Sequence, residues 1–137
     1  MKTIIDELKD EHSQLAEILR EVKKFGIANP KGKEALIKAK NTLLNHLRKE
    51  DLKLYPLLRS HAKENPALDD LLNTFAKDME TVSTVAFDFF KKYEHADTSM
   101  EFARDFGTLY AALGNRIRKE ESILYEEYNN IINSVSA

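Results

Sequence analysis

The sequence has no cysteine, which excludes disulfides, thiol chemistry and zinc sites built from thiolates. It has no apolar run that could span a membrane and no apolar N-terminal segment typical of a signal peptide, so we expect a cytoplasmic protein without a membrane partner. Its net charge is only -2, which provides no basic field to attract nucleic acid. It also lacks a Gly-rich phosphate loop and a Ser or Cys nucleophile set, so no familiar catalytic motif is present.

What the chain does contain is helical patterning. Its 137 residues are 32% charged and 42% hydrophobic, which suits one charge-coated helical domain spanning 1–137. Apolar residues recur at alternating steps of three and four over four stretches, about 3–25, 33–61, 66–93 and from 98 onwards. Four helices of this length with short connections predict an all-α, up-down-up-down antiparallel four-helix bundle.

Several residues predict where these helices end or bend. Gly26 is expected to stop the first helix, and Pro56 is expected to kink the second. Asn65 followed by proline predicts the start of the third helix. Thr98, with Glu101 three residues later, has the spacing of a capping box and predicts the start of the fourth.

The inward apolar row of three helices is interrupted by polar residues. Antiparallel folding of the four helices places these interruptions at one level, with Met79 of the third helix on the remaining side. Burying imidazoles and charges at such positions costs several kcal/mol unless they are paired. The residues concerned are His12, His46, Glu50, Arg116 and Glu120.

The segment 45–51 recurs as 115–121, at a constant offset of 70 residues. Both copies keep the carboxylate, Glu50 or Glu120, but the second copy has Arg116 where the first has His46. A tyrosine, Tyr55 or Tyr125, follows each carboxylate by five residues. We expect these tyrosines either to be plain core residues or to hydrogen-bond the ligands of a site from outside.

Two interpretations of the polar residues remain open. Imidazole and carboxylate ligands facing inward in a bundle suit iron, manganese or zinc. Alternatively, Arg116 pairs with the carboxylates and the histidines complete a hydrogen-bonded plug that needs no metal. The absence of a Glu-x-x-His motif excludes the ferritin-like di-iron pattern.

On the basis of His12 and the two repeated segments, the chain resembles the hemerythrin-like HHE cation-binding domain family. The resemblance runs from about residue 4 to residue 128 and is most specific over 46–56. It implies a four-helix bundle that typically holds a non-haem di-iron centre and binds or senses oxygen, iron or redox state. His12 and His46 match histidine ligands of the family, and Glu50 and Glu120 match its bridging carboxylates.

The chain also departs from the family pattern. Met79 and Arg116 stand where the family usually has histidines, and Ser83 stands where some members have another. We therefore expect at most one metal ion, iron with manganese or zinc as alternatives, held by His12, His46, Glu50 and Glu120. The partners would be the metal ion and dioxygen or another small ligand. Alternative functions are a metal-free interaction or regulatory module, and a non-haem iron oxidase or peroxidase; an enzyme is not the first expectation.

Overall fold

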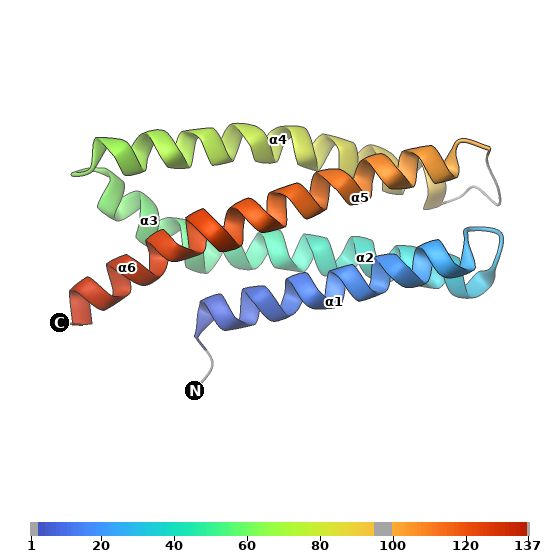
Figure 1. Ribbon diagram of the computed structural model, residues 1–137, viewed down its shortest axis with the longest axis horizontal. Helices are drawn as coiled ribbons and strands as arrows, with labels where there is room; N and C mark the ends of the chain where they lie inside the picture. The colour runs from blue at the N-terminus through green and yellow to red at the C-terminus, as the bar shows by residue number, and fades with distance from the viewer. Residues whose placement is uncertain (1–2, 95–99, 137) are drawn as a thin grey trace.

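The computed structural model describes residues 3–94 and 100–136. Over these residues the chain forms four rods, each antiparallel to the one before it in sequence (Figure 1). The predicted all-α four-helix bundle is therefore confirmed. The elements are α1 (Ile4–Phe25), α2 (Pro30–Lys49), the π-helical turn η1 (Glu50–Leu54), α3 (Tyr55–Ala62), α4 (Pro66–Glu94), α5 (Phe102–Lys119), the π-helical turn η2 (Glu120–Leu124) and α6 (Tyr125–Ser136).

Local residues determine the ends of the first two rods. Thr3 and Asp6 form a capping box at the start of α1, and Gly26, with φ of 73°, ends that helix in a conformation that favours glycine. The side chain of Asn29 caps α2, whose first residue is Pro30. The second rod thus begins three residues earlier than predicted, because Asn29 is its N-cap and Pro30 its first helical residue.

The third and fourth rods begin in different ways. The side chain of Asn65 accepts the backbone N–H of Leu68 at 3.1 Å, which confirms the predicted cap of α4. Thr98, the predicted cap of the last rod, lies outside the described residues. Glu101 occupies the N-cap position itself, with no side-chain cap hydrogen bond, so it is not the third residue of a capping box and α5 starts at Phe102.

Two π-helical turns interrupt the second and fourth rods at equivalent places. The backbone N–H of Tyr55 donates to the carbonyl of Glu50, and that of Tyr125 donates to the carbonyl of Glu120. The widening begins at Glu50, before Pro56, and a similar turn occurs in the second copy, which has no proline, so the π-helical turn itself does not depend on proline. α3 then turns away from the axis of α2 towards the start of α4 (Figure 1).

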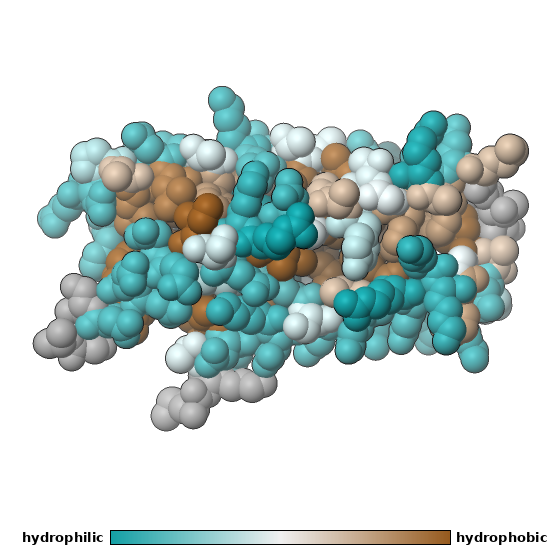
Figure 2. All heavy atoms as spheres, in the orientation of Figure 1, coloured by the Kyte–Doolittle hydropathy of each residue, from teal (hydrophilic) through white to brown (hydrophobic). Residues whose placement is uncertain are grey.

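The interior consists of two apolar clusters separated by a polar layer. One cluster lies towards the end of α1 and the start of α2 and includes Leu15, Leu43 and Leu113, whereas the other includes Leu8, Leu54 and Leu124. The polar residues fall between these positions on each rod. On the face seen in Figure 2, hydrophilic residues cover most of the surface and hydrophobic atoms show mainly in the recesses between helices. None of the helices in the described residues is long and apolar enough to cross a bilayer.

Candidate metal centre

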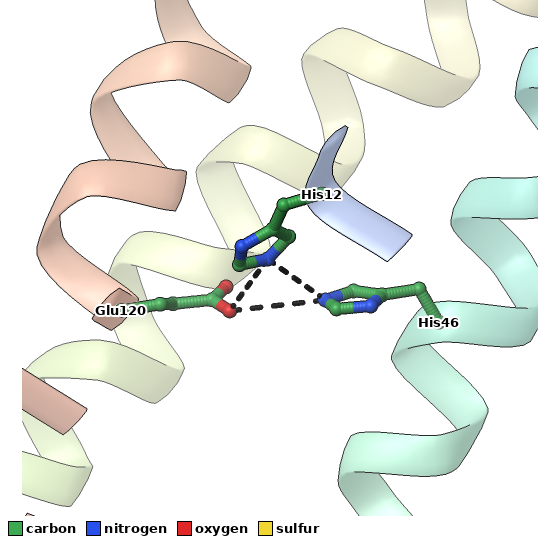
Figure 3. A group of neighbouring side chains, drawn as sticks. All are labelled: His12, His46 and Glu120. Atoms are coloured by element: carbon green, nitrogen blue, oxygen red, sulfur yellow. Dashed lines mark hydrogen bonds and ion pairs between the residues drawn. The ribbon is translucent and has the colours of Figure 1, made fainter. Parts of the chain in front are cut away.

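The polar layer is buried at the centre of the bundle. His12 and His46 are each 4% exposed and Glu50 is 1% exposed, with Arg116 and Glu120 buried beside them. The predicted convergence of these five side chains is confirmed. Figure 3 shows His12, His46 and Glu120 pointing towards one another from α1, α2 and the beginning of η2.

The two histidines are held from outside by carboxylates that the sequence analysis missed. Nδ1 of His12 lies 2.8 Å from Oε2 of Glu121, and Nδ1 of His46 lies 2.8 Å from Oε1 of Glu11. An ionised carboxylate can only accept, so both Nδ1 atoms carry the donated proton. Glu11 also accepts from Lys49, and these hydrogen bonds outweigh burial and lower the pKa of Glu11.

Glu11 and Glu121 had a signal in the sequence. Glu11 directly precedes His12, and Glu121 directly follows Glu120, so each stands beside a candidate ligand. Neither lies on the inward row of its helix, which is why the helical pattern did not single them out. In a bundle, however, a residue at the edge of that row can reach across to the neighbouring helix.

Because each Nδ1 is protonated, the Nε2 lone pairs of the two rings point inward. The two Nε2 atoms lie 3.1 Å apart. Nε2 of His12 is 3.4 Å from Oε2 of Glu120, and Nε2 of His46 is 3.5 Å from Oε1 of Glu50. Donor atoms around an ion with bonds of about 2.1 Å are about 3.0 to 3.4 Å apart in octahedral or tetrahedral geometry. The centre therefore already has roughly the spacing of a ligand set.

Burial and charge interactions raise the pKa values of His46 and Glu50 and lower that of Glu120. Burial alone would lower the pKa of His46, but hydrogen bonds to Glu120 and Glu50 outweigh it and raise the pKa to about 10. Burial raises the pKa of Glu50 to about 7, and the charge of Glu120 adds to that effect. Hydrogen bonds from His12 and His46 outweigh burial and hold the pKa of Glu120 well below its ordinary value. The raised pKa of His46 favours a second proton on that ring, at Nε2, when no metal ion takes its place.

Arg116 closes one side of the centre. Its Nε donates to Oε1 of Glu120 at 2.9 Å, and its Nη1 lies 2.9 Å from the carbonyl of Phe75 and 3.3 Å from Asp78. The expectation that Arg116 bridges Glu120 and Glu50 is only half right: among the described residues, its carboxylate partners are Glu120 and Asp78. The guanidinium also lies over the ring of Phe75, 4.7 Å from its centroid, so it is fully surrounded.

The two repeated tyrosines both hydrogen-bond the polar layer, so neither is a plain core residue. The Tyr125 hydroxyl lies 2.8 Å from Glu120 and 2.9 Å from Glu50, and thereby links the two carboxylates. The Tyr55 hydroxyl instead accepts from Nη2 of Arg116 at 3.1 Å. Burial raises the pKa of both phenols.

Met79 differs from the other residues predicted around the centre. It is only partly buried, packs against the cluster that contains Leu43, and lines an open groove of about 700 Å³ between α3 and α4. Tyr55 and Ser83 line the same groove. Met79 and Ser83, the positions on this helix where members of the family have histidines, therefore line an open groove. Tyr55 lines the same groove and contacts Arg116.

A second groove, of about 280 Å³, lies between α1 and α5 and reaches His12 and Glu121. Gly114 lines it, and a Cβ at this position would meet only Nη1 of Arg118, at 3.6 Å. A Cβ at Gly107 would meet nothing within 4 Å. Two glycines seven residues apart could allow a neighbouring helix to approach closely or leave open space. Among the described residues no other helix approaches either glycine closely, so Gly114 provides open space beside the centre.

Comparison with known protein families identifies the family. A family model described as the hemerythrin HHE cation binding domain matches residues 3–128. No curated protein and no solved structure matches the chain. The family match confirms the resemblance drawn from the two repeated segments and His12, and it extends over the whole polar layer.

Proposed function

The chain belongs to the hemerythrin HHE cation-binding domain family, and on this premise we propose that it holds one metal ion in the polar layer. His12, His46, Glu50 and Glu120 would be the ligands, with iron as the first candidate and manganese or zinc as alternatives. His12, His46 and Glu120 each offer a ligand atom, and these atoms all lie within 4.8 Å of one another. Imidazole and carboxylate donors in this number suit such ions.

The observation that supports the proposal best is an excess of acceptors at the centre. Two imidazole lone pairs and the oxygens of Glu50 and Glu120 converge there, while the Tyr125 hydroxyl has one proton to donate. The short contacts around that hydroxyl cannot all be hydrogen bonds. A cation at the centre would satisfy the remaining lone pairs, and the outward hydrogen bonds of His12 and His46 are the arrangement usual for metal-bound histidine.

Arg116 explains why we propose one ion instead of two. Its guanidinium is always charged, and it contacts Glu120 on the side away from the histidines. A second divalent cation beside a buried guanidinium would be repelled, and the histidines that bind it elsewhere in the family are replaced by Arg116 and Met79. In this proposal the side chain of Arg116 supplies the second positive charge.

For the role of the site, we propose a metal-binding or sensing module that responds to iron, dioxygen or redox state. A bound iron ion would supply Lewis acidity and a redox couple. The protein's own residues would hold the ion, exclude bulk water from it and fix the imidazole tautomers. The groove beside His12 offers a small ligand a short path to this buried centre.

One observation favours the alternative, a metal-free bundle that acts as an interaction or regulatory module. Among the described residues, every buried side-chain nitrogen and oxygen lies within hydrogen-bond distance of a partner. An additional proton at His46 would make that network self-sufficient, since the raised pKa of His46 keeps it charged at neutral pH. The two functions therefore differ in what occupies the centre, a proton or a metal ion.

Metal content distinguishes these two functions. The protein is purified without chelators, analysed for metals, then stripped and titrated anaerobically with Fe(II), Mn(II) and Zn(II). We expect about one tightly bound ion per chain. His46→Gln should abolish this binding, whereas His61→Gln, at an exposed position in α3, is the matched control and should leave it unchanged.

The number of bound ions distinguishes the proposed functions. Two ions per chain would contradict the single-ion centre, and no ion even after titration would support the metal-free network. Turnover of peroxide or dioxygen by the loaded protein, absent in His46→Gln and present in His61→Gln, would instead indicate the oxidase or peroxidase function.

A further inference from the structure

Tyr125 is not one of the four expected ligands, yet its hydroxyl group lies among them. Its hydroxyl oxygen lies 2.8 Å from Oε2 of Glu120, 2.9 Å from Oε2 of Glu50 and 3.3 Å from Nε2 of His12. These three partners come from different rods of the bundle. The side chain is fully buried, and its ring stacks on the His12 imidazole at an interplanar angle of 12°.

The π-helical turn is what brings this residue inward. In a regular α-helix the residue five positions after Glu120 would face away from it, because five residues correspond to about 500° of rotation. In η2 the backbone N–H of Tyr125 donates to the carbonyl of Glu120, so the widened turn stacks Tyr125 over Glu120. The exposed side chain of Ile123, at 41%, shows that the inward face has moved to later residues.

The equivalent tyrosine in the first repeat has a different environment. Tyr55 follows an identical π-helical turn, but its hydroxyl accepts a hydrogen bond from the guanidinium of Arg116. The hydroxyl oxygen of Tyr55 therefore already has a positively charged partner. Within the part of the chain that the structure describes, the Tyr125 hydroxyl contacts two carboxylates and an imidazole nitrogen, so the two tyrosines, equivalent in sequence, have opposite neighbours.

We propose that Tyr125 is itself a ligand of the metal ion, through its phenolate oxygen. The inference rests on the proposed function, and it adds a hard oxygen donor to the two imidazoles and two carboxylates. The separations of 2.8 to 3.3 Å from neighbouring donor atoms are close to those of adjacent ligands on one ion. On coordination the O–H bond breaks, an oxygen–metal bond forms and the proton is released to solvent. Phenolate is a known iron ligand in proteins and favours the ferric state.

Visible spectroscopy of the iron-loaded protein tests this inference. The stripped protein is loaded with one equivalent of Fe(II), oxidised to Fe(III), and its iron content is measured on the same sample. Phenolate bound to Fe(III) produces a charge-transfer band in the visible region, and excitation in that band enhances the ring vibrations of the bound tyrosine in resonance Raman spectra. We expect the band in the parent and in Tyr55→Phe, and its loss in Tyr125→Phe, with iron bound in all three.

Tyr55→Phe is the matched control, because it removes the equivalent hydroxyl from the other half of the layer. If Tyr125→Phe does not fold, ring-deuterated tyrosine in the parent and in Tyr55→Phe still decides: the enhanced Raman bands shift if a tyrosine is bound, and a shift that persists in Tyr55→Phe assigns the ligand to Tyr125, whose hydroxyl contacts Glu50 and Glu120. Ferric protein without the band, or with a band that survives in Tyr125→Phe, overturns the inference and leaves the single-ion proposal intact. A parent that binds no iron overturns both.

Discussion

Nε2 of His12 and Nε2 of His46 face each other at 3.1 Å, although both rings donate their Nδ1 protons outward to carboxylates. Two lone pairs at this separation repel unless a proton or a metal ion lies near both. Glu121 and Glu11 therefore do more than hold the rings in place, since they determine which nitrogen is available to a cation. The properties of the centre should respond to these two outer carboxylates.

Replacing Glu121 should weaken metal binding. Glu121→Gln keeps the size of the side chain but removes the charge that orients His12 and makes its Nε2 more basic. We expect the affinity for the ion to fall about 10- to 100-fold, the usual effect of losing such an outer partner. Titration of the stripped protein with Fe(II) or Zn(II) measures this. Glu126→Gln, at an exposed position five residues further on, should bind as the parent does; equal losses in the two variants would show a general charge effect.

Arg116→Met should destabilise the metal-free protein. The guanidinium is 3% exposed and is the cationic partner of Glu120, so its removal leaves a buried carboxylate without that partner. We expect a loss of about 3 kcal/mol in the free energy of unfolding, as for one broken partner of a buried pair. Urea denaturation with a chelator present measures the cost, and added metal should reduce it because a cation then balances the charge of Glu120.

Arg118→Met is the control for that measurement. Arg118 lies two residues away on α5 but is exposed, and its Nη2 donates to the side-chain oxygen of Asn115 at 3.2 Å. Its replacement should change the free energy of unfolding by less than about 0.5 kcal/mol. Similar losses for the two variants, unaffected by metal, would mean that Arg116 contributes packing alone.

The sequence predicted the bundle and most of the polar layer because both depend on one periodicity. Residues at steps of three and four on His12's helix are buried as predicted, from Ile5 to Val22. His12, His46 and Arg116 were identifiable because they interrupt otherwise apolar rows. The apolar rows do not include Glu11, Asp78 or Glu121. Their roles become visible only in the structure, where their carboxylates contact His46, Arg116 and His12 on neighbouring helices.

The same periodicity failed after each carboxylate. Continuing the steps of three and four from Glu50 and Glu120 predicts Leu57 and Ile123 on the inward rows, seven and three residues further on, but Leu57 is half-buried and Ile123 is exposed. The fully buried residues are instead Leu54 and Leu58 after Glu50, and Leu124 and Tyr125 after Glu120. Each π-helical turn shifts the inward face by about one residue, and a pattern based on 3.6 residues per turn cannot include that shift.

The stability of the metal-free protein should depend on pH through His46 and Glu50. The raised pKa of His46 contributes stability that is fully present below its ordinary value of 6.5 and is lost as pH rises through about 10. The raised pKa of Glu50 contributes stability present below 4.5 and lost as pH rises through about 7. We therefore expect the free energy of unfolding to fall steadily between pH 6 and 10.

Urea denaturation in the presence of chelator, repeated across this range, gives the profile. The lowered pKa of Glu120 acts in the opposite direction, but only in acid, where its contribution is lost as pH falls. In His46→Gln the decline above pH 7 should disappear. With metal bound the decline should also disappear, because the ion replaces the proton; a flat profile in the metal-free parent would contradict the predicted proton at His46.

Deleting Leu52 should be tolerated better than deleting a residue of a regular helix. Leu52 lies in η1 and is 69% exposed, so its side chain contributes little to packing. A π-helical turn contains about one residue more than an α-helical turn, and removing that residue converts η1 to α-helix while Glu50 and Leu58 keep their inward orientation.

Deleting Asn41, which is exposed within α2, is the control. This deletion rotates the residues on one side of it by about 100° and moves them by about 1.5 Å, so His46 and Glu50 leave the inward face. We expect cooperative thermal unfolding and metal binding in the Leu52 deletion, and loss of both in the Asn41 deletion. Circular dichroism melts and metal titration of the two variants measure this, and equal damage from the two deletions would show that the π-helical turn is itself required for the bundle.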